Sequence, residues 1–186
     1  MSLRKEVIGG ILNVVLAGTM IDDGQGGTVA VSSTVKPASD SAAWESLGCV
    51  KDVKFDKKTA SESITCFNPA SGKYEEETED VVLADYWDVT VKEHSPLVWQ
   101  LLFGIKEIIS GTDAVLSYEA SVREVYAWAQ FQAKNARDQV NRTVIDRWVK
   151  VTLKSYAGFS EKVTLPELRY QMLHSPLNGQ IFMANL

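Results

Sequence analysis

Residues 80–104, DVVLADYWDVTVKEHSPLVWQLLFG, indicate the centre of the fold. The first half alternates for a dozen residues, with apolar side chains on both faces, and a period of two rich in β-branched and aromatic residues is typical of a long strand. The period then changes. Ser95 is a good N-cap, Pro96 suits the first helical position, and apolar residues follow at helical spacing. The stretch therefore predicts a long strand that leads into one short helix at about 95–104.

Length and composition indicate an ordinary soluble domain. The chain has 186 residues, of which 45% are hydrophobic, and its net charge is −5. This charge argues against a general polyanion-binding surface. It is compatible with a protein that contacts nucleic acid without binding it stably. The apolar segment 7–17 follows two basic residues, but Glu6 and Asn13 interrupt the pattern and no clean cleavage site follows. We expect a folded or docking segment there, not a signal peptide.

The remaining periodicity predicts several more strands. Candidates are 7–17, 28–31, 49–55, 63–67, 122–133, 143–153, 163–173 and 180–183, separated by polar turns at 56–61 and 134–141 and by an acidic loop at 68–80. We expect an irregular connection at 105–116. The first quarter of the chain has few core residues. We therefore expect a partly flexible N-terminal arm, 1–43, and one domain, 44–186. The fold class is mainly β (α+β): two packed antiparallel sheets, as a sandwich or barrel, flanked by one short helix.

No pattern for catalysis, a metal or a cofactor is present in the sequence. His94 and His174 each precede Ser-Pro at the boundary of an element, but Ser95 is better explained as a helix cap, and no nucleophile elbow occurs. Metal-ligand spacing, a phosphate loop and a dinucleotide fingerprint are also missing. The acids of 75–80 lack the spacing of a calcium loop, so we expect a solvated acidic loop. We expect no enzyme, no cofactor and no metal.

The cysteines and tryptophans favour packing roles. Cys49 and Cys66 fall in neighbouring strand candidates, so a disulfide is conceivable, but reduced core thiols are the favoured interpretation. Five tryptophans are many for this length. Core packing is the default for each, with interface use plausible for one or two.

Charge is separated along the sequence. Eight acids lie in 75–93 (Glu75, Glu76, Glu77, Glu79, Asp80, Asp85, Asp88 and Glu93) against Lys92, and six bases lie in 134–154 (Lys134, Arg137, Arg142, Arg147, Lys150 and Lys154) against Asp138 and Asp146. The simpler interpretation is two solvated faces. The sharper one is a self-complementary pair, in which the acidic edge of one copy meets the basic edge of the next. Such head-to-tail contacts close into rings or continue as filaments.

The order of elements over 44–186 resembles that of a phage tail tube protein, the major tail protein. The resemblance lies in Trp44-Glu-Ser-Leu-Gly48, the strand at 50–55, the long loop, the alternating strand ending at Lys92-Glu93, the helix ending in Leu-Leu-Phe-Gly104, and the closing strands. No single motif is diagnostic. The segment 1–43 departs from the family, since it is longer and more apolar. The tube protein of type VI secretion shares the family's architecture.

The resemblance implies a structural virion protein. Its members pack two β-sheets across each other and assemble as hexameric rings, which stack into a tube that conducts DNA without binding it specifically. Partners would be other copies and tail proteins such as the tape measure and terminator, with no membrane. The location would be a phage tail made in a bacterial cytoplasm, with a prophage as one source. In this family the loop matching 68–80 reaches the adjacent ring.

Combined with the charge pattern, the resemblance gives a set of expected inter-subunit residues. They are Lys73, Tyr74, Glu75, Glu76, Glu77, Glu79, Asp80, Arg137, Arg142, Arg147 and Lys150. Three alternatives remain open: a type VI secretion tube-like protein, a head–tail connector, and a soluble β-sandwich binding module.

Overall fold

A computed structural model describes residues 8–48, 50–93, 95–103, 107–109, 115–117, 124–135, 141–156, 165–178 and 182–183. The elements are β1 (Ile8–Leu16), β2 (Met20–Asp22), β3 (Thr28–Ala30), β4 (Glu45–Ser46), β5 (Val50–Asn68), β6 (Lys73–Val91), α1 (Pro96–Phe103), β7 (Glu107–Ile109), β8 (Val115–Ser117), β9 (Val125–Asn135), β10 (Asn141–Ser155), β11 (Glu167–Met172) and β12 (Phe182–Met183). The mainly β class with one short helix is confirmed.

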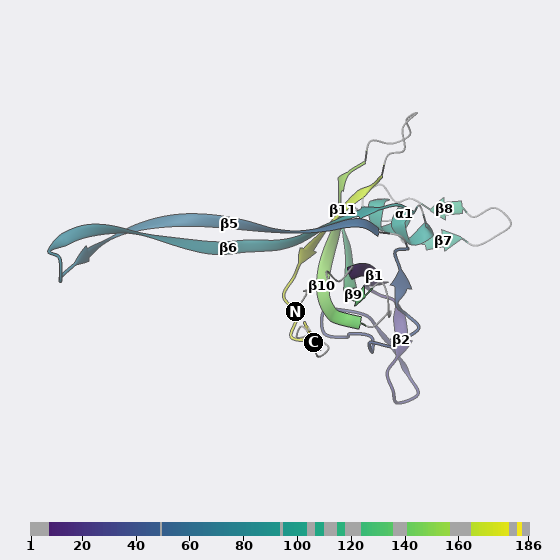
Figure 1. Cartoon of the computed structure of the whole chain (residues 1–186). Coiled ribbons are helices and arrows are strands. Elements are labelled where there is room, and N and C mark those ends of the chain that lie inside the picture. Colours follow the sequence, from purple (N-terminus) through teal and green to yellow (C-terminus); the bar gives the residue numbers. More distant parts are fainter. Residues whose placement is uncertain are drawn as a thin grey trace, which may run out of the picture.

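One large antiparallel sheet organises the molecule. Its strand order is β4-β1-β9-β10-β11-β6-β5, and β12 pairs with β10. The pairs β2–β3 and β7–β8 form two small sheets of their own. Within the described ranges the sheets are antiparallel and no closed barrel forms. The body gathers most of these strands, whereas β5 and β6 run far out from it as a paired ribbon (Figure 1).

The main core lies between the inner face of the sheet and α1. Apolar residues of the opening stretch enter it as predicted, with Trp87, Val89 and Val91 from the strand. From α1 come Leu97, Val98, Leu101 and Leu102, all buried. The predicted cap is confirmed: the backbone N–H of Val98 donates to Ser95 Oγ at 3.3 Å. The alternating strand and its helix are therefore the centre of the core.

A second, smaller core covers the other face of the sheet. Val15, Val31, Trp128 and Trp148 are buried together there. The segment between β1 and β4 is held over this face because Trp128 Nε1 donates to the Ser32 carbonyl at 2.8 Å. The C-terminal segment joins it, with Ser175 Oγ donating to the Ser33 carbonyl at 2.6 Å. The prediction that tryptophans pack in the core holds for Trp87, Trp128 and Trp148.

The predicted division into an arm, 1–43, and a domain, 44–186, does not match the packing. β1 pairs with β9 along its whole length, from Ile8↔Asn135 to Leu16↔Ala127, and so lies inside the main sheet. Leu12 and Val14 belong to the main core. A strand from the N-terminus completes the sheet because antiparallel partners need no proximity in sequence. Residues 1–7 lie outside the described part of the chain.

The structure also corrects the predicted strand boundaries around the acidic region. The expected turn at 56–61 does not exist: β5 is continuous from Val50 to Asn68. The expected loop at 68–80 is mostly strand, because only a turn at 69–72 separates β5 from β6. The connection at 105–116 contains parts of the small β7–β8 hairpin. Polar side chains on both faces hid the long ribbon from a pattern that requires a buried face.

Two smaller predictions are also decided by the described residues. Cys66 is a free thiol, but it is exposed near the outer end of β5, so it is not a core cysteine. Because Cys66 is free, the conceivable Cys49–Cys66 disulfide is not formed. Cys49 and His94 themselves lie outside the described residues. Among the described residues, no helix is long and apolar enough to cross a bilayer.

Candidate interaction surface

The feature that distinguishes this chain is the projecting ribbon formed by β5 and β6. β11 pairs with β6 only as far out as Gln171↔Tyr86. Beyond that point, among the strands that the structure describes, β5 and β6 pair only with each other, from Lys57↔Asp85 to Asn68↔Lys73. At ~3.3 Å per residue the free part extends about 40 Å. It leaves the body as a narrow, twisted two-stranded arm (Figure 1).

The end of the ribbon is a specified turn. Asn68 Oδ1 accepts from the Ala70 N–H at 2.9 Å, and Gly72, with a φ of 66°, donates its N–H to the Asn68 carbonyl at 2.9 Å. Glu75 closes the turn by accepting from Asn68 Nδ2 at 2.8 Å and from Ser71 Oγ at 2.7 Å. These two hydrogen bonds lower the pKa of the Glu75 carboxyl. The turn therefore fixes which residues face each other along the ribbon.

Aromatic side chains are exposed at this end. Phe67 is 53% exposed and Tyr74 is 75% exposed. They are register partners, and their rings pack edge to face with centroids 5.3 Å apart. An isolated two-stranded ribbon is marginally stable in water. Covering the exposed apolar groups at its end with another surface would be favourable in free energy. The ribbon therefore has the properties of an arm that binds a partner.

The outer ribbon also carries the net charge of the molecule. Residues 59–80 contain six acids (Glu62, Glu75, Glu76, Glu77, Glu79 and Asp80) and one base (Lys73), a net charge of −5, which equals that of the whole chain. All other residues together are therefore neutral. The register pairs Glu79 with Glu62, so both strands of the outer ribbon contribute acids. A surface of net positive charge would complement this excess.

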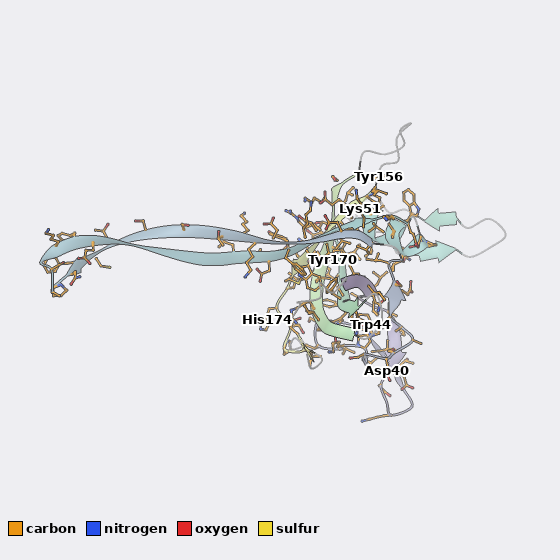
Figure 2. All side chains as sticks on the ribbon, in the orientation of Figure 1. Asp40, Trp44, Lys51, Tyr156, Tyr170 and His174 are labelled. Carbon is orange, nitrogen blue, oxygen red and sulfur yellow. The ribbon has the colours of Figure 1, made fainter. Side chains whose placement is uncertain are left out.

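A groove of about 240 Å³ lies where the ribbon joins the body. Its apolar lining comes from Phe55, Trp87, Ile145 and Met172. Phe55 is 60% exposed and packs edge to face on Trp87, at a centroid distance of 5.6 Å. Tyr170 lies in the body beside this joint, fully buried (Figure 2). An exposed phenylalanine in an open groove is a second apolar surface without cover in the single chain.

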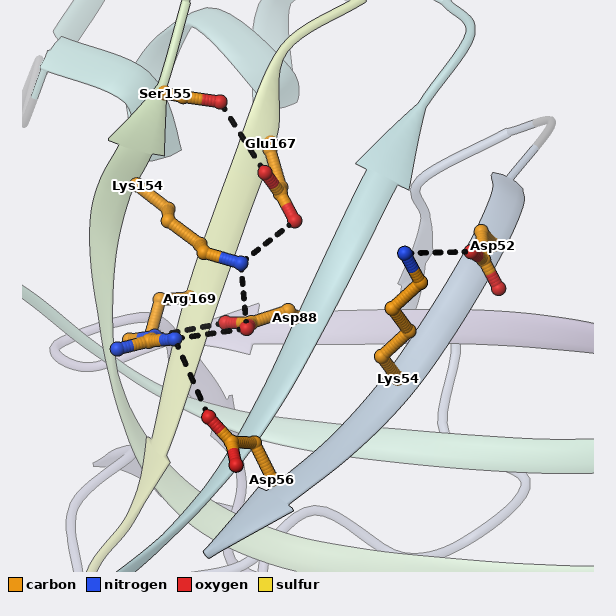
Figure 3. Close-up of polar contacts among 8 residues, drawn as sticks. All are labelled: Asp52, Lys54, Asp56, Asp88, Lys154, Ser155, Glu167 and Arg169. Carbon is orange, nitrogen blue, oxygen red and sulfur yellow. Dashed lines mark hydrogen bonds and ion pairs between the residues drawn. The ribbon is translucent and has the colours of Figure 1, made fainter. Parts of the chain in front are cut away.

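A charge network braces the outer face of the same joint (Figure 3). Asp88 is buried and accepts from Arg169 Nε at 2.7 Å, from Arg169 Nη2 at 2.8 Å and from Lys154 Nζ at 2.7 Å. Lys154 also contacts Glu167 at 2.9 Å, and Arg169 lies 3.7 Å from Asp56. The hydrogen bonds from Arg169, opposed by burial, are the main reason that the pKa of Asp88 falls to about 2. The network ties β6, β10 and β11 together at the base of the ribbon.

The structure places the predicted inter-subunit residues in three groups. Lys73, Tyr74 and Glu75 lie at the outer end of β6, and Glu76, Glu77, Glu79 and Asp80 follow along the same strand. Arg142, Arg147 and Lys150 lie on β10, away from the ribbon end, and Arg137 falls outside the described residues. Lys150 contacts Glu124 of its own chain at 2.8 Å. The acidic and basic groups are therefore separate in one chain.

Sequence reasoning missed the groove at the ribbon base and the residues that line it. Phe55 and Met172 are far apart in the sequence, and no local pattern brings them together. The sequence does contain a signal for the ribbon. The turn sequence at 68–72 is flanked on both sides by stretches rich in threonine, serine or β-branched residues, a pattern typical of a hairpin. Among the described residues, no group of three or more His, Cys, Asp or Glu side chains is placed to hold a metal ion.

Comparisons with known proteins give limited similarity. No protein family matches the chain. No curated protein matches it either. Among solved structures, the chain is similar to a protein in the tail of an empty GTA particle, described as computed with helical refinement in C6 symmetry. The identity is 11%, the alignment covers 81% of this chain and 92% of that chain, and the TM-score is 0.40. A TM-score this low assigns neither fold nor function to the chain.

Proposed function

We propose that the chain is a structural subunit of a phage-type tail tube, which assembles with copies of itself through the β5–β6 ribbon. The observation that carries this proposal is the ribbon. At a rise of ~3.3 Å per residue its outer part is about 40 Å long, and no third described strand pairs with it there. A marginally stable arm with exposed aromatic residues at its end lowers the stability of a monomer. A partner that covers these residues would offset that loss of stability. The element order of 44–186, which resembles that of tail tube proteins, points to another copy as the partner.

In the proposed assembly, subunits form rings, expected to be hexameric, that stack into a conduit for DNA. The net charge of −5 suits this role because phosphate binding depends on basic surfaces. The role requires no catalysis, cofactor or metal. Tail proteins such as a tape measure and a terminator are the expected further partners, and the virion is the expected location. A type VI secretion tube would use the same contacts, and the genes beside this one distinguish the two contexts.

A shortened ribbon tests the proposal. Lys58 and Ala84 are register partners, so a two-residue Asn-Gly turn that joins them removes the outer ribbon and keeps the strand pairing below it. The unaltered chain is expected to form rings or tubes in negative-stain images and light scattering at high concentration, when nucleated by tail proteins if needed. The shortened chain is expected to remain a folded monomer, because it lacks its main contact surface.

A matched control shortens another hairpin, β2–β3. Asp22 and Thr28 are register partners in β2–β3, and an Asn-Gly turn replaces residues 23–27. This variant is expected to assemble like the unaltered chain. Assembly by the chain with the shortened ribbon, or no assembly by the unaltered chain under nucleating conditions, would contradict the proposed function.

A further inference from the structure

We infer that the outer end of the ribbon binds the groove at the ribbon base of a second copy. The inference rests on the proposed self-assembly and specifies which surfaces meet. The inserted end presents the exposed pair Phe67 and Tyr74. The receiving groove presents the exposed Phe55 with Ile145 and Met172, in a hollow of about 240 Å³. Both surfaces expose apolar side chains that no described part of the chain covers.

Distance excludes the same contact within one chain. Phe67 and Phe55 lie on the same strand, twelve residues apart, and β5 is extended between them. At ~3.3 Å per residue they are about 40 Å apart, so the end of the ribbon cannot reach its own groove. Each copy therefore offers its ribbon end and its groove to other copies, and in the proposed stack of rings these are different neighbours. Contacts of this head-to-tail type generate a ring or a filament.

Charge complementarity favours a second copy over an unrelated apolar partner. The outer ribbon has a net charge of −5, whereas residues 50–58 at its base hold four lysines (Lys51, Lys54, Lys57 and Lys58) and two aspartates (Asp52 and Asp56), a net charge of +2. Arg147 and Lys57 line the groove itself. Two carboxylates also lie there: Asp85 lies 4.0 Å from Lys57, and Asp56 lies 3.7 Å from Arg169. The surplus positive charge therefore comes from the other lysines at the base of β5.

The structure also argues against the basic strand β10 as the main partner of the acidic ribbon. Lys150 contacts Glu124 at 2.8 Å, and Lys154 contacts Asp88 and Glu167 at 2.7 and 2.9 Å. These lysines would have to leave partners in their own chain before they could bind another. Lys51 and Lys58, by contrast, are exposed and have no ion pair with another described residue. The base of β5 is therefore the more available cationic surface.

Cross-linking between two distinguishable copies tests the contact. Copy A carries an affinity tag and Cys49→Ser, so that the exposed Cys66 beside Phe67 is its only thiol. Copy B carries Cys49→Ser and Cys66→Ser, with Asp85→Cys at the groove. Its matched control carries Asp40→Cys in place of Asp85→Cys, at an exposed site on another part of the body (Figure 2). A short bis-maleimide is added to each assembled mixture.

The expected result is an A–B product that is about tenfold or more abundant with Asp85→Cys than with Asp40→Cys, since docking raises the local thiol concentration. Assembled mixtures that cross-link no better through Asp85→Cys would overturn the inference and leave the proposed function standing. A mixture of unaltered chains that never assembles would instead overturn the proposed function, and the inference with it.

A second pair of variants tests the aromatic end without a cross-linker. Phe67→Ser with Tyr74→Ser is expected to raise the minimum concentration for assembly by about tenfold or more, because both side chains lose their cover in the partner. Met20→Ser, at a site 58% exposed and outside the ribbon, is the control and should leave that concentration unchanged. Equal assembly by the double variant and the control would overturn the inference.

Discussion

Arg169 donates two parallel hydrogen bonds to the buried carboxylate of Asp88, from Nε at 2.7 Å and from Nη2 at 2.8 Å. The two residues are register partners on β11 and β6, close to the last pair of these strands, Gln171↔Tyr86, beyond which the ribbon leaves the sheet. The guanidinium also lies over the Tyr86 ring, 4.7 Å from its centroid. This pair fixes the base of the ribbon to the body, so the direction of the arm depends on it.

Removal of the Asp88 carboxylate is expected to destabilise the fold. In Asp88→Asn, Arg169 and Lys154 lose the anion that both contact, at a cost of about 2–3 kcal/mol in the free energy of unfolding. Urea denaturation followed by tryptophan fluorescence measures this change. Asp85→Asn is the control, because Asp85 is exposed and lies 4.0 Å from Lys57, so its loss should change stability by less than ~0.5 kcal/mol. Equal effects would show that the pair does not brace the joint.

Stability should also depend on pH through Asp88. Its pKa falls from 3.8 to about 2 in the folded protein, so the folded state binds the proton more weakly than the unfolded state. The stabilisation is therefore fully present above pH 3.8 and is lost as pH falls towards 2, by about 2 kcal/mol. Urea denaturation between pH 5 and about 2 should show a steeper loss for the unaltered chain than for Asp88→Asn. Parallel curves would contradict the assignment.

Hydrogen exchange should divide the long strands into two parts. In the monomer, backbone amides of 59–68 and 73–82 are expected to exchange much faster than those of β9 and β10, because the ribbon has no core beneath it. Mass spectrometry of peptides from exchanged protein measures this difference. Assembly is expected to slow exchange at 64–76 in particular. Slow exchange along the whole ribbon in a verified monomer would contradict the marginal stability on which the proposed function rests.

The tryptophans provide a test of the second core. Trp128→Phe removes the indole donor of the partly buried hydrogen bond to the Ser32 carbonyl and leaves that acceptor without its partner, at a cost of about 1–3 kcal/mol. Trp44→Phe is the matched control: Trp44 Nε1 also donates to a carbonyl, that of Ala38 at 2.8 Å, but at an exposed site. Its loss should cost less than ~1 kcal/mol in the same unfolding measurement. A reversed order would mean that residues 31–44 do not cover the sheet tightly.

The sequence by itself determined the local structure where one face of an element is buried. The alternation of 80–91 predicted the inner half of β6, and the cap at Ser95 predicted where α1 begins, because both signals act between neighbours in the chain. The catalytic and metal patterns missing from the sequence gave no reason to expect chemistry. Glu75 is exposed, as the acidic composition of 75–80 predicted, but this stretch is part of the strand β6 and not a loop.

Only the tertiary structure decided how far the strands run and which residues meet. β5 and β6 pair for their full length because the turn at 69–72 sets their register, and this pairing needs no apolar face that a periodic pattern would reveal. β1 enters the main sheet through β9, more than a hundred residues away in the sequence. The groove arises where β5, β6, β10 and β11 converge. Local sequence carries no record of such convergence, because it depends on contacts between segments that are distant along the chain.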